Sequence, residues 1–151
     1  MLASIVILAV FFTGASVSPD IPELCDPLPA QAKALNTEIL ISPAQTRAAY
    51  SVLIGDLEFE LGVDEDGRIV FVSPTSSKFG TPEGIRVGDS YHRLQKVVAT
   101  TPDVLSGWAY VVDLPSGWKA AFVQGKTMTE GELRGTTKVT FIFKGQHSCG
   151  R

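Results

Sequence analysis

The sequence predicts an α+β fold, in which an antiparallel sheet of about five strands carries two short helices on one face. The first observation is a period-two alternation of apolar and polar residues, clearest over 57–63, which is typical of strands. The second is a pair of segments with helix-capping residues. The third is their order: helix, strand, strand, then the same again with a last strand appended. This order predicts a helix-strand-strand pseudo-repeat.

The N-terminal segment differs from the rest of the chain. Residues 1–12, MLASIVILAVFF, are too short an apolar run for a membrane-spanning helix, which needs about 20 residues. Small residues follow, so we expect a signal peptide over residues 1–16, cleaved after Ala15 or Ser16. The run contains no Lys or Arg, and an uncleaved anchor is the alternative. The expected location is secreted or periplasmic, with a mature form that is soluble or loosely associated with the envelope.

The chain contains two cysteines, Cys25 and Cys149. In an oxidising compartment such a pair permits one intramolecular disulfide. This bridge would close a very long loop, for which the chain-entropy model gives about 4–5 kcal/mol of stabilisation. His147 stands close to Cys149, but the sequence has no CxxC and no second histidine cluster to complete a metal site. We therefore predict a disulfide, and neither a metal nor a cofactor.

Residues 17–36 contain repeated prolines and predict an extended arm, followed by one globular α+β domain over residues 37–151. The domain opens with a capping pattern. Ser42 suits an N-cap, Pro43 the first helical position, and Gln45 completes the spacing of a capping box. Residues 43–53 are therefore predicted as a helix that ends at Gly55.

The remaining elements are predicted from alternation and turn residues. Residues 57–63 and 69–72 form a hairpin, whose acidic turn lacks the glycine and acidic positions of a calcium loop. A second helix begins at Asp89 or Ser90 and runs to Ala99. A second hairpin spans 107–124, residues 125–137 form a loop, and 138–145 form a closing strand. The alternation places Val139, Phe141 and Phe143 on one face of this strand.

Charge and motif content exclude several kinds of function. The net charge is −3, the pI is about 5.3, and no cluster of Lys or Arg marks a nucleic-acid surface. The only histidines are His92 and His147, and neither lies in a hydrolase motif such as G-x-S-x-G. No glycine-rich phosphate cradle is present either. The sequence therefore predicts a protein that is not an enzyme, with an unrecognised hydrolase as a third-ranked hypothesis.

Aromatic residues gather in the second hairpin. Trp108, Tyr110, Val112 and Leu114 share a face on the alternation, and Trp118 stands on the returning strand. One interpretation is that these side chains fill the core. The other is an exposed patch that binds a partner, because Trp and Tyr contribute much binding energy per residue. On this second interpretation the candidate binding residues are Trp108, Tyr110, Trp118 and Tyr91.

Two family resemblances bear on function. Residues 60–94, with the motif GIRVGD at 84–89, resemble the middle of a PDZ domain, which implies a peptide-binding module. The departures are Gln95-Lys96 in place of the usual Asn-Gly turn, and the tryptophan hairpin.

A second resemblance covers more of the chain. The pattern F-x-T-P-x-G-I-x-V-G, a helix, G-W-x-Y and a hairpin ending in A-A-F is similar to secreted bacterial proteins. Their helix-plus-sheet units resemble the repeats of β-lactamase inhibitor proteins and small outer-membrane lipoproteins. This resemblance implies a non-catalytic, inhibitor-like domain that binds another extracytoplasmic protein; it names no target. The PDZ-like module is the alternative, and a helix over 90–99 favours the first resemblance whereas a strand there favours the second.

Overall fold

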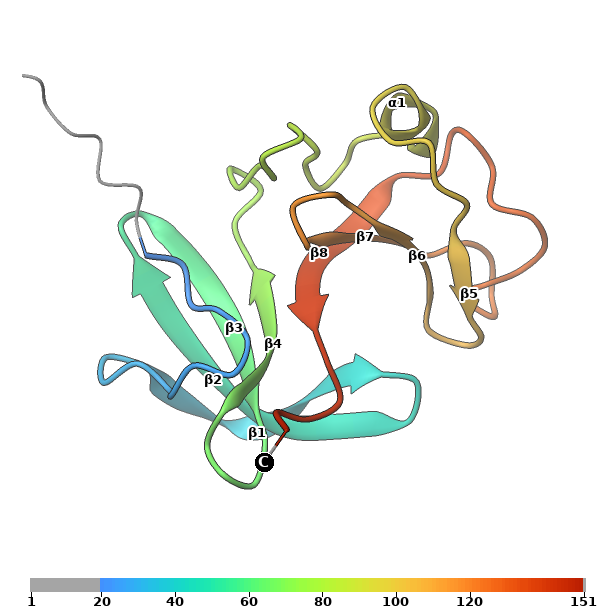
Figure 1. The fold of residues 1–151 in the computed structure, drawn as a ribbon. Helices are drawn as coiled ribbons and strands as arrows, with labels where there is room; N and C mark the ends of the chain where they lie inside the picture. The colour runs from blue at the N-terminus through green and yellow to red at the C-terminus, as the bar shows by residue number, and fades with distance from the viewer. Residues whose placement is uncertain (1–19, 151) are drawn as a thin grey trace, which may run out of the picture.

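The computed structural model describes residues 20–150, so the predicted signal peptide lies outside the described residues. These residues form one eight-stranded antiparallel sheet in the order β1-β2-β3-β4-β8-β7-β6-β5 (Figure 1). The elements are β1 (Lys33–Ser42), β2 (Gln45–Ile54), β3 (Leu57–Val63), β4 (Ile69–Pro74), α1 (Tyr91–Gln95), β5 (Asp103–Leu105), β6 (Ala109–Asp113), β7 (Lys119–Phe122) and β8 (Val139–Gly145). No helix in the described part of the chain is long and apolar enough to cross a membrane.

The predicted α+β class is wrong, because the described chain is nearly all β. The segment expected as the first helix is the ten-residue strand β2. Pro43 and Ala44 form the turn that precedes it, with Ala44 at a φ of 58°, and the Ser42 hydroxyl donates to Gln45 Oε1 at 2.9 Å. The Ser-Pro-x-Gln pattern of residues 42–45 therefore forms a hairpin turn in this protein and not the start of a helix. The strand wins over the helix because β2 pairs with β1 on one side and with β3 on the other.

Together with β2, two further strands raise the number from about five to eight. β1 begins at Lys33, inside the range assigned to the proline-rich arm, and lies at one edge of the sheet. β5 contains three residues and lies at the opposite edge. Both are therefore edge strands, where pairing with one neighbour is enough to define the element.

Other predicted elements are present. The hairpins β3–β4 and β6–β7 and the closing strand β8 form where alternation placed them. The second helix also begins as expected, since Ser90 is the N-cap of α1 and its Oγ accepts from the backbone N–H of Arg93 at 3.1 Å. α1 is shorter than predicted and ends at Gln95, with no strand over 90–99.

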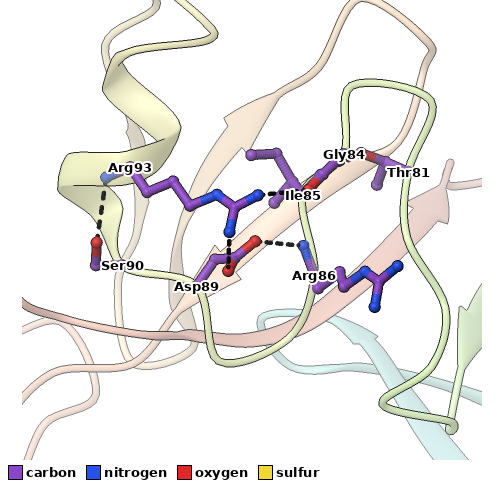
Figure 2. Close-up of polar contacts among 7 residues, drawn as sticks. All are labelled: Thr81, Gly84, Ile85, Arg86, Asp89, Ser90 and Arg93. Carbon is purple, nitrogen blue, oxygen red and sulfur yellow. Dashed lines mark hydrogen bonds and ion pairs between the residues drawn. The ribbon is translucent and has the colours of Figure 1, made fainter.

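The connector before α1, residues 81–90, is held by local hydrogen bonds (Figure 2). Asp89 accepts from the backbone N–H of Arg86 at 2.8 Å and pairs with Arg93 at 3.1 Å. Gly84 and Gly88 have φ angles of 80° and 91°, a backbone conformation that suits glycine. These bonds turn the chain so that Ile85 is fully buried in the core.

The sheet buries an apolar cluster on each face. We call the larger one the arm-side cluster, because residues of the N-terminal arm, including Ile21, Leu24 and Leu28, pack against it. Its fully buried members are Val52, Phe59, Leu61, Ile69, Val72, Ile85, Leu94, Tyr110, Val112, Ala120, Phe122, Val139 and Ile142. The groove-side cluster lies on the other face and consists of Ile41, Val70, Phe71, Trp108, Ala109, Val111, Ala121 and Phe143. Burying each large side chain contributes about 1.5–3 kcal/mol.

Two predictions about shared faces are wrong for the same kind of reason. Val139 belongs to the arm-side cluster, whereas Phe141 and Phe143 pack with the groove-side cluster, because a bulge shifts the β7–β8 register next to Phe122. Trp108 and Tyr110 likewise lie on different faces of the sheet, Trp108 in the groove-side cluster and Tyr110 in the arm-side cluster. Trp108 lies in the turn before β6, where Gly107 has a φ of 72°, so strict alternation does not extend to it.

The predicted disulfide between Cys25 and Cys149 is present, with the two Cα atoms 5.5 Å apart. Backbone hydrogen bonds fix the arm beside it: Cys25 N–H donates to Ile69 O at 2.8 Å, and Ile69 N–H donates to Asp26 O at 3.0 Å. The arm and the C-terminal tail are thereby joined at the start of β4.

Candidate functional site

A groove lies between the two edges of the sheet. Its walls come from β1 and the start of β2 on one side and from β5 on the other, while β6, β7, β8, the β5–β6 turn and the tail supply the rest. In Figure 1 the β1–β2 turn reaches below the lower ends of β8 and β5. The groove has a volume of about 260 Å³ and is lined by Ile41, Ser42, Gln45, Asp103, Leu105, Trp108, Val111, Asp113, Lys119, Phe143, Gly145, Gln146 and His147.

The floor of the groove is apolar and aromatic. Trp108 and Phe143 pack edge to face, with ring centroids 5.4 Å apart, and Phe71 stacks behind Phe143 at 5.4 Å. Ile41 and Val111 complete this surface. Because every ring is fixed by another ring, the floor is a preformed surface, which lowers the entropic cost of binding.

The rim of the groove is polar. Lys119 forms an ion pair with Asp113 across the β6–β7 pair, and the ring Nδ1 of His147 lies 2.8 Å from Gln45 Oε1. Asp103 is exposed and forms no ion pair within residues 20–150. An apolar floor with a polar rim is the usual construction of a protein-binding surface.

A second pocket lies on the opposite face of β5, with a volume of about 350 Å³. Val104 of β5 lines it, together with Tyr91 of α1 and Tyr110 of β6. The Tyr110 hydroxyl donates to the backbone oxygen of Gly131, which anchors the 125–137 loop over this pocket. The other lining residues are Gln95, Thr101, Pro102, Glu132, Leu133 and Gly135. We call it the tyrosine pocket.

The four candidate binding residues are all buried, between 2% and 8% exposed, and form no common exposed patch. Trp108 lies in the groove floor, whereas Tyr91 and Tyr110 line the tyrosine pocket on the other face of β6. Trp118 lies in the arm-side cluster, where its ring centroid is 4.8 Å from that of Phe79. Lys144 Nζ lies over the Trp118 ring, 5.0 Å from the ring centroid. Burial therefore supports the interpretation that they fill the core, with three of them also bordering pockets.

The residues that complete the groove were not singled out from the sequence. Ile41 and Leu105 come from opposite edges of the sheet, and Asp103 from a strand of three residues. The only local signal for β5 is a short apolar pair after Pro102, which is too short for a period to be recognised.

Groups able to do acid–base or metal chemistry are dispersed. Within residues 20–150 no cluster of three or more His, Cys, Asp or Glu side chains could hold a metal ion.

Glu83 accepts two hydrogen bonds from Ser116, one from the backbone N–H at 2.6 Å and one from the side-chain hydroxyl at 2.9 Å. Burial by itself raises the pKa of Glu83. Hydrogen bonds from its own backbone, from Ser116 and from Thr81 stabilise the carboxylate by more, so the pKa is lowered below the ordinary value of 4.5. Glu83 is thus a structural anion that ties the connector to the β6–β7 turn.

No protein-family model, no curated protein and no solved structure matches this chain.

Proposed function

We propose that this protein is a secreted or periplasmic, non-catalytic domain that binds another extracytoplasmic protein, and that the groove between β1 and β5 is its binding site. The observation behind the proposal is the preformed aromatic floor of Trp108 and Phe143, open between two sheet edges. An apolar surface of this kind provides the anchor position of a protein interface.

The size of the groove supports a protein partner over a cofactor. Small-molecule sites usually enclose about 300–1,000 Å³, and the groove, at about 260 Å³, is smaller. It suits one or two side chains of a partner whose remaining contacts spread over the polar rim. The proposed compartment is supported by the Cys25–Cys149 disulfide, because such bonds persist in oxidising environments.

The experiment is affinity capture from envelope fractions and culture medium, with the exported protein as bait. Leu105→Arg places a charged side chain at the groove wall. Leu53→Arg is the matched control, since Leu53 is 63% exposed on β2 and lines none of the pockets described above. We expect a captured protein that Leu53→Arg retains and Leu105→Arg loses. Equal capture by both variants contradicts the assignment of the groove.

Peptide binding, the alternative, is favoured by a separate observation. The outer side of β5 has no neighbouring strand in the described sheet. An open sheet edge can accept an extended peptide as an additional strand.

A further inference from the structure

The free edge of β5 exposes backbone hydrogen-bonding groups at one position. Leu105 O accepts from Trp108 N–H at 3.0 Å, so the peptide groups of Leu105 face β6. Val104 lies opposite Tyr110 in the register. Because the direction of backbone groups alternates along an antiparallel strand, the N–H and C=O of Val104 point away from β6. They are available to an incoming strand.

The side chains of β5 divide between the two pockets. Asp103 and Leu105 line the groove, and Val104 between them lines the tyrosine pocket. A strand placed against this edge would follow the same alternation, since successive side chains of a strand point to opposite faces. Its neighbouring side chains would therefore enter the groove and the tyrosine pocket in turn.

On the basis of the proposed function, we propose that the ligand is an extended, basic peptide segment of the partner protein. This segment adds as a strand to the free edge of β5 and places alternate side chains in the groove and in the tyrosine pocket. The edge offers only three residues, so backbone bonds position the segment and the two pockets supply its specificity.

The charge around β5 indicates a basic segment. Asp103 and Asp113 lie on the groove and Glu132 on the tyrosine pocket, whereas the one lysine or arginine among the two sets of lining residues is Lys119. Lys119 is already paired with Asp113. The exposed carboxylates of Asp103 and Glu132 are therefore left to attract Lys or Arg side chains that flank the apolar anchors.

The other edge of the sheet is less suited to strand addition. β1 has two register shifts in its pairing with β2, and Asn36 within it has a φ of 54°. Its exposed edge also carries the charged residues Lys33 and Glu38. Bulges and charges of this kind are common protections of a sheet edge against pairing.

The probe is a displayed library of random peptides, each about eight residues long, selected on the exported full-length protein at low salt. We expect the selected peptides to be enriched in Lys and Arg over Asp and Glu, with apolar residues at adjacent positions that enter opposite pockets. Binding should weaken as salt rises, because the attraction involves exposed charges.

Two variants of Val104 test strand addition directly. Val104→Pro removes the outward N–H and leaves the neighbouring bonds to β6 in place, and proline is tolerated on edge strands. Val104→Thr keeps the N–H and a branched side chain. Loss of one backbone hydrogen bond, about 1.4 kcal/mol, predicts a roughly tenfold weaker Kd for Val104→Pro. We expect Val104→Thr, which changes only the side chain that lines the tyrosine pocket, to bind the peptides more tightly than Val104→Pro, with thermal unfolding showing that both variants fold.

Asp103→Lys tests the charge argument without altering the backbone. We expect it to weaken binding of the selected peptides and to abolish the enrichment of Lys and Arg in a repeated selection. This variant keeps the test decisive if Val104→Pro fails to fold.

The outcomes separate this proposal from the proposed function. Peptides that bind Val104→Pro and Val104→Thr equally, an enrichment of acidic peptides, or no enrichment overturn strand addition by a basic segment. If Leu105→Arg still abolishes capture of a protein partner, the groove remains the binding site and that partner binds it by another geometry. Failure of both experiments rejects the two proposals together.

Discussion

Glu83 is the residue whose chemistry is most clearly tied to the fold. Its carboxylate is held by the backbone and hydroxyl of Ser116, 33 residues further along the chain. This contact joins the connector before α1 to the turn of the β6–β7 hairpin, whose strand β6 lines both pockets. A single side chain thereby couples two parts of the chain that no strand pairing links.

Glu83→Gln is expected to lower the free energy of unfolding by about 1–2 kcal/mol at neutral pH, because one of its two acceptor oxygens becomes a donor. Since the folded-state pKa of Glu83 is lowered, its stabilisation is fully present above the ordinary value of 4.5 and is lost as pH falls through the folded-state pKa. The difference between parent and variant should therefore shrink in acid. Urea unfolding over a pH series measures it.

Glu65→Gln is the control for this prediction, because Glu65 is exposed in the turn between β3 and β4. It should leave stability within about 0.5 kcal/mol of the parent at every pH. If Glu83→Gln were as stable as Glu65→Gln at neutral pH, the contact with Ser116 would make no net contribution to the free energy of unfolding.

At the scale of elements, the β1–β2 turn occupies the segment where the sequence predicts the start of a helix. Ala44 in this turn has a positive φ of 58°, a conformation that costs a residue with a Cβ about 1–2 kcal/mol. Ala44→Gly should therefore raise the thermal unfolding temperature. Gly55→Ala supplies the opposite test, because Gly55 has a φ of 62° and open space around it, and it should lower that temperature. A helix over 43–53 would reverse the effect of Ala44→Gly, since alanine favours helices.

The strands recognisable from sequence are those with apolar residues on at least one buried face. β3 alternates Leu57, Phe59 and Leu61 with polar residues, and this local pattern was sufficient to predict the strand. β1 could not be found in this way, because most of its side chains are exposed and its pairing with β2 defines it. β2 was misassigned because Ser42, Pro43 and Gln45 suit a helix start and a hairpin turn equally well.

The groove was less accessible to sequence reasoning than the strands. Trp108 was a candidate because tryptophan is prominent in any interface, and it does lie in the groove floor. Ile41 and Leu105 belong to opposite edges in the sheet order, yet both line the groove, because the sheet curves and brings its two edge strands to one opening. Local patterns carry no information about that order.

At the scale of the whole molecule, the disulfide links the arm to a tail that borders the groove. Cys25 and Cys149 are 124 residues apart, and Gly145 to His147 line the groove just before Cys149. Cys25→Ser and Cys149→Ser should each lower the free energy of unfolding by about 4–5 kcal/mol on the chain-entropy model. The double variant should lose no more than either single one, because the same bond is removed. Additive losses, or free thiols in the protein purified without reductant, would contradict a single bridge.

The central claim is that a partner segment pairs with β5 at Val104. Amide hydrogen exchange of Val104 tests it most directly, measured by NMR on the purified protein alone and saturated with a selected peptide. We predict fast exchange in the free protein and protection of about tenfold or more with the peptide, because the N–H then donates to the added strand. Unchanged exchange of Val104 at saturation would contradict the claim.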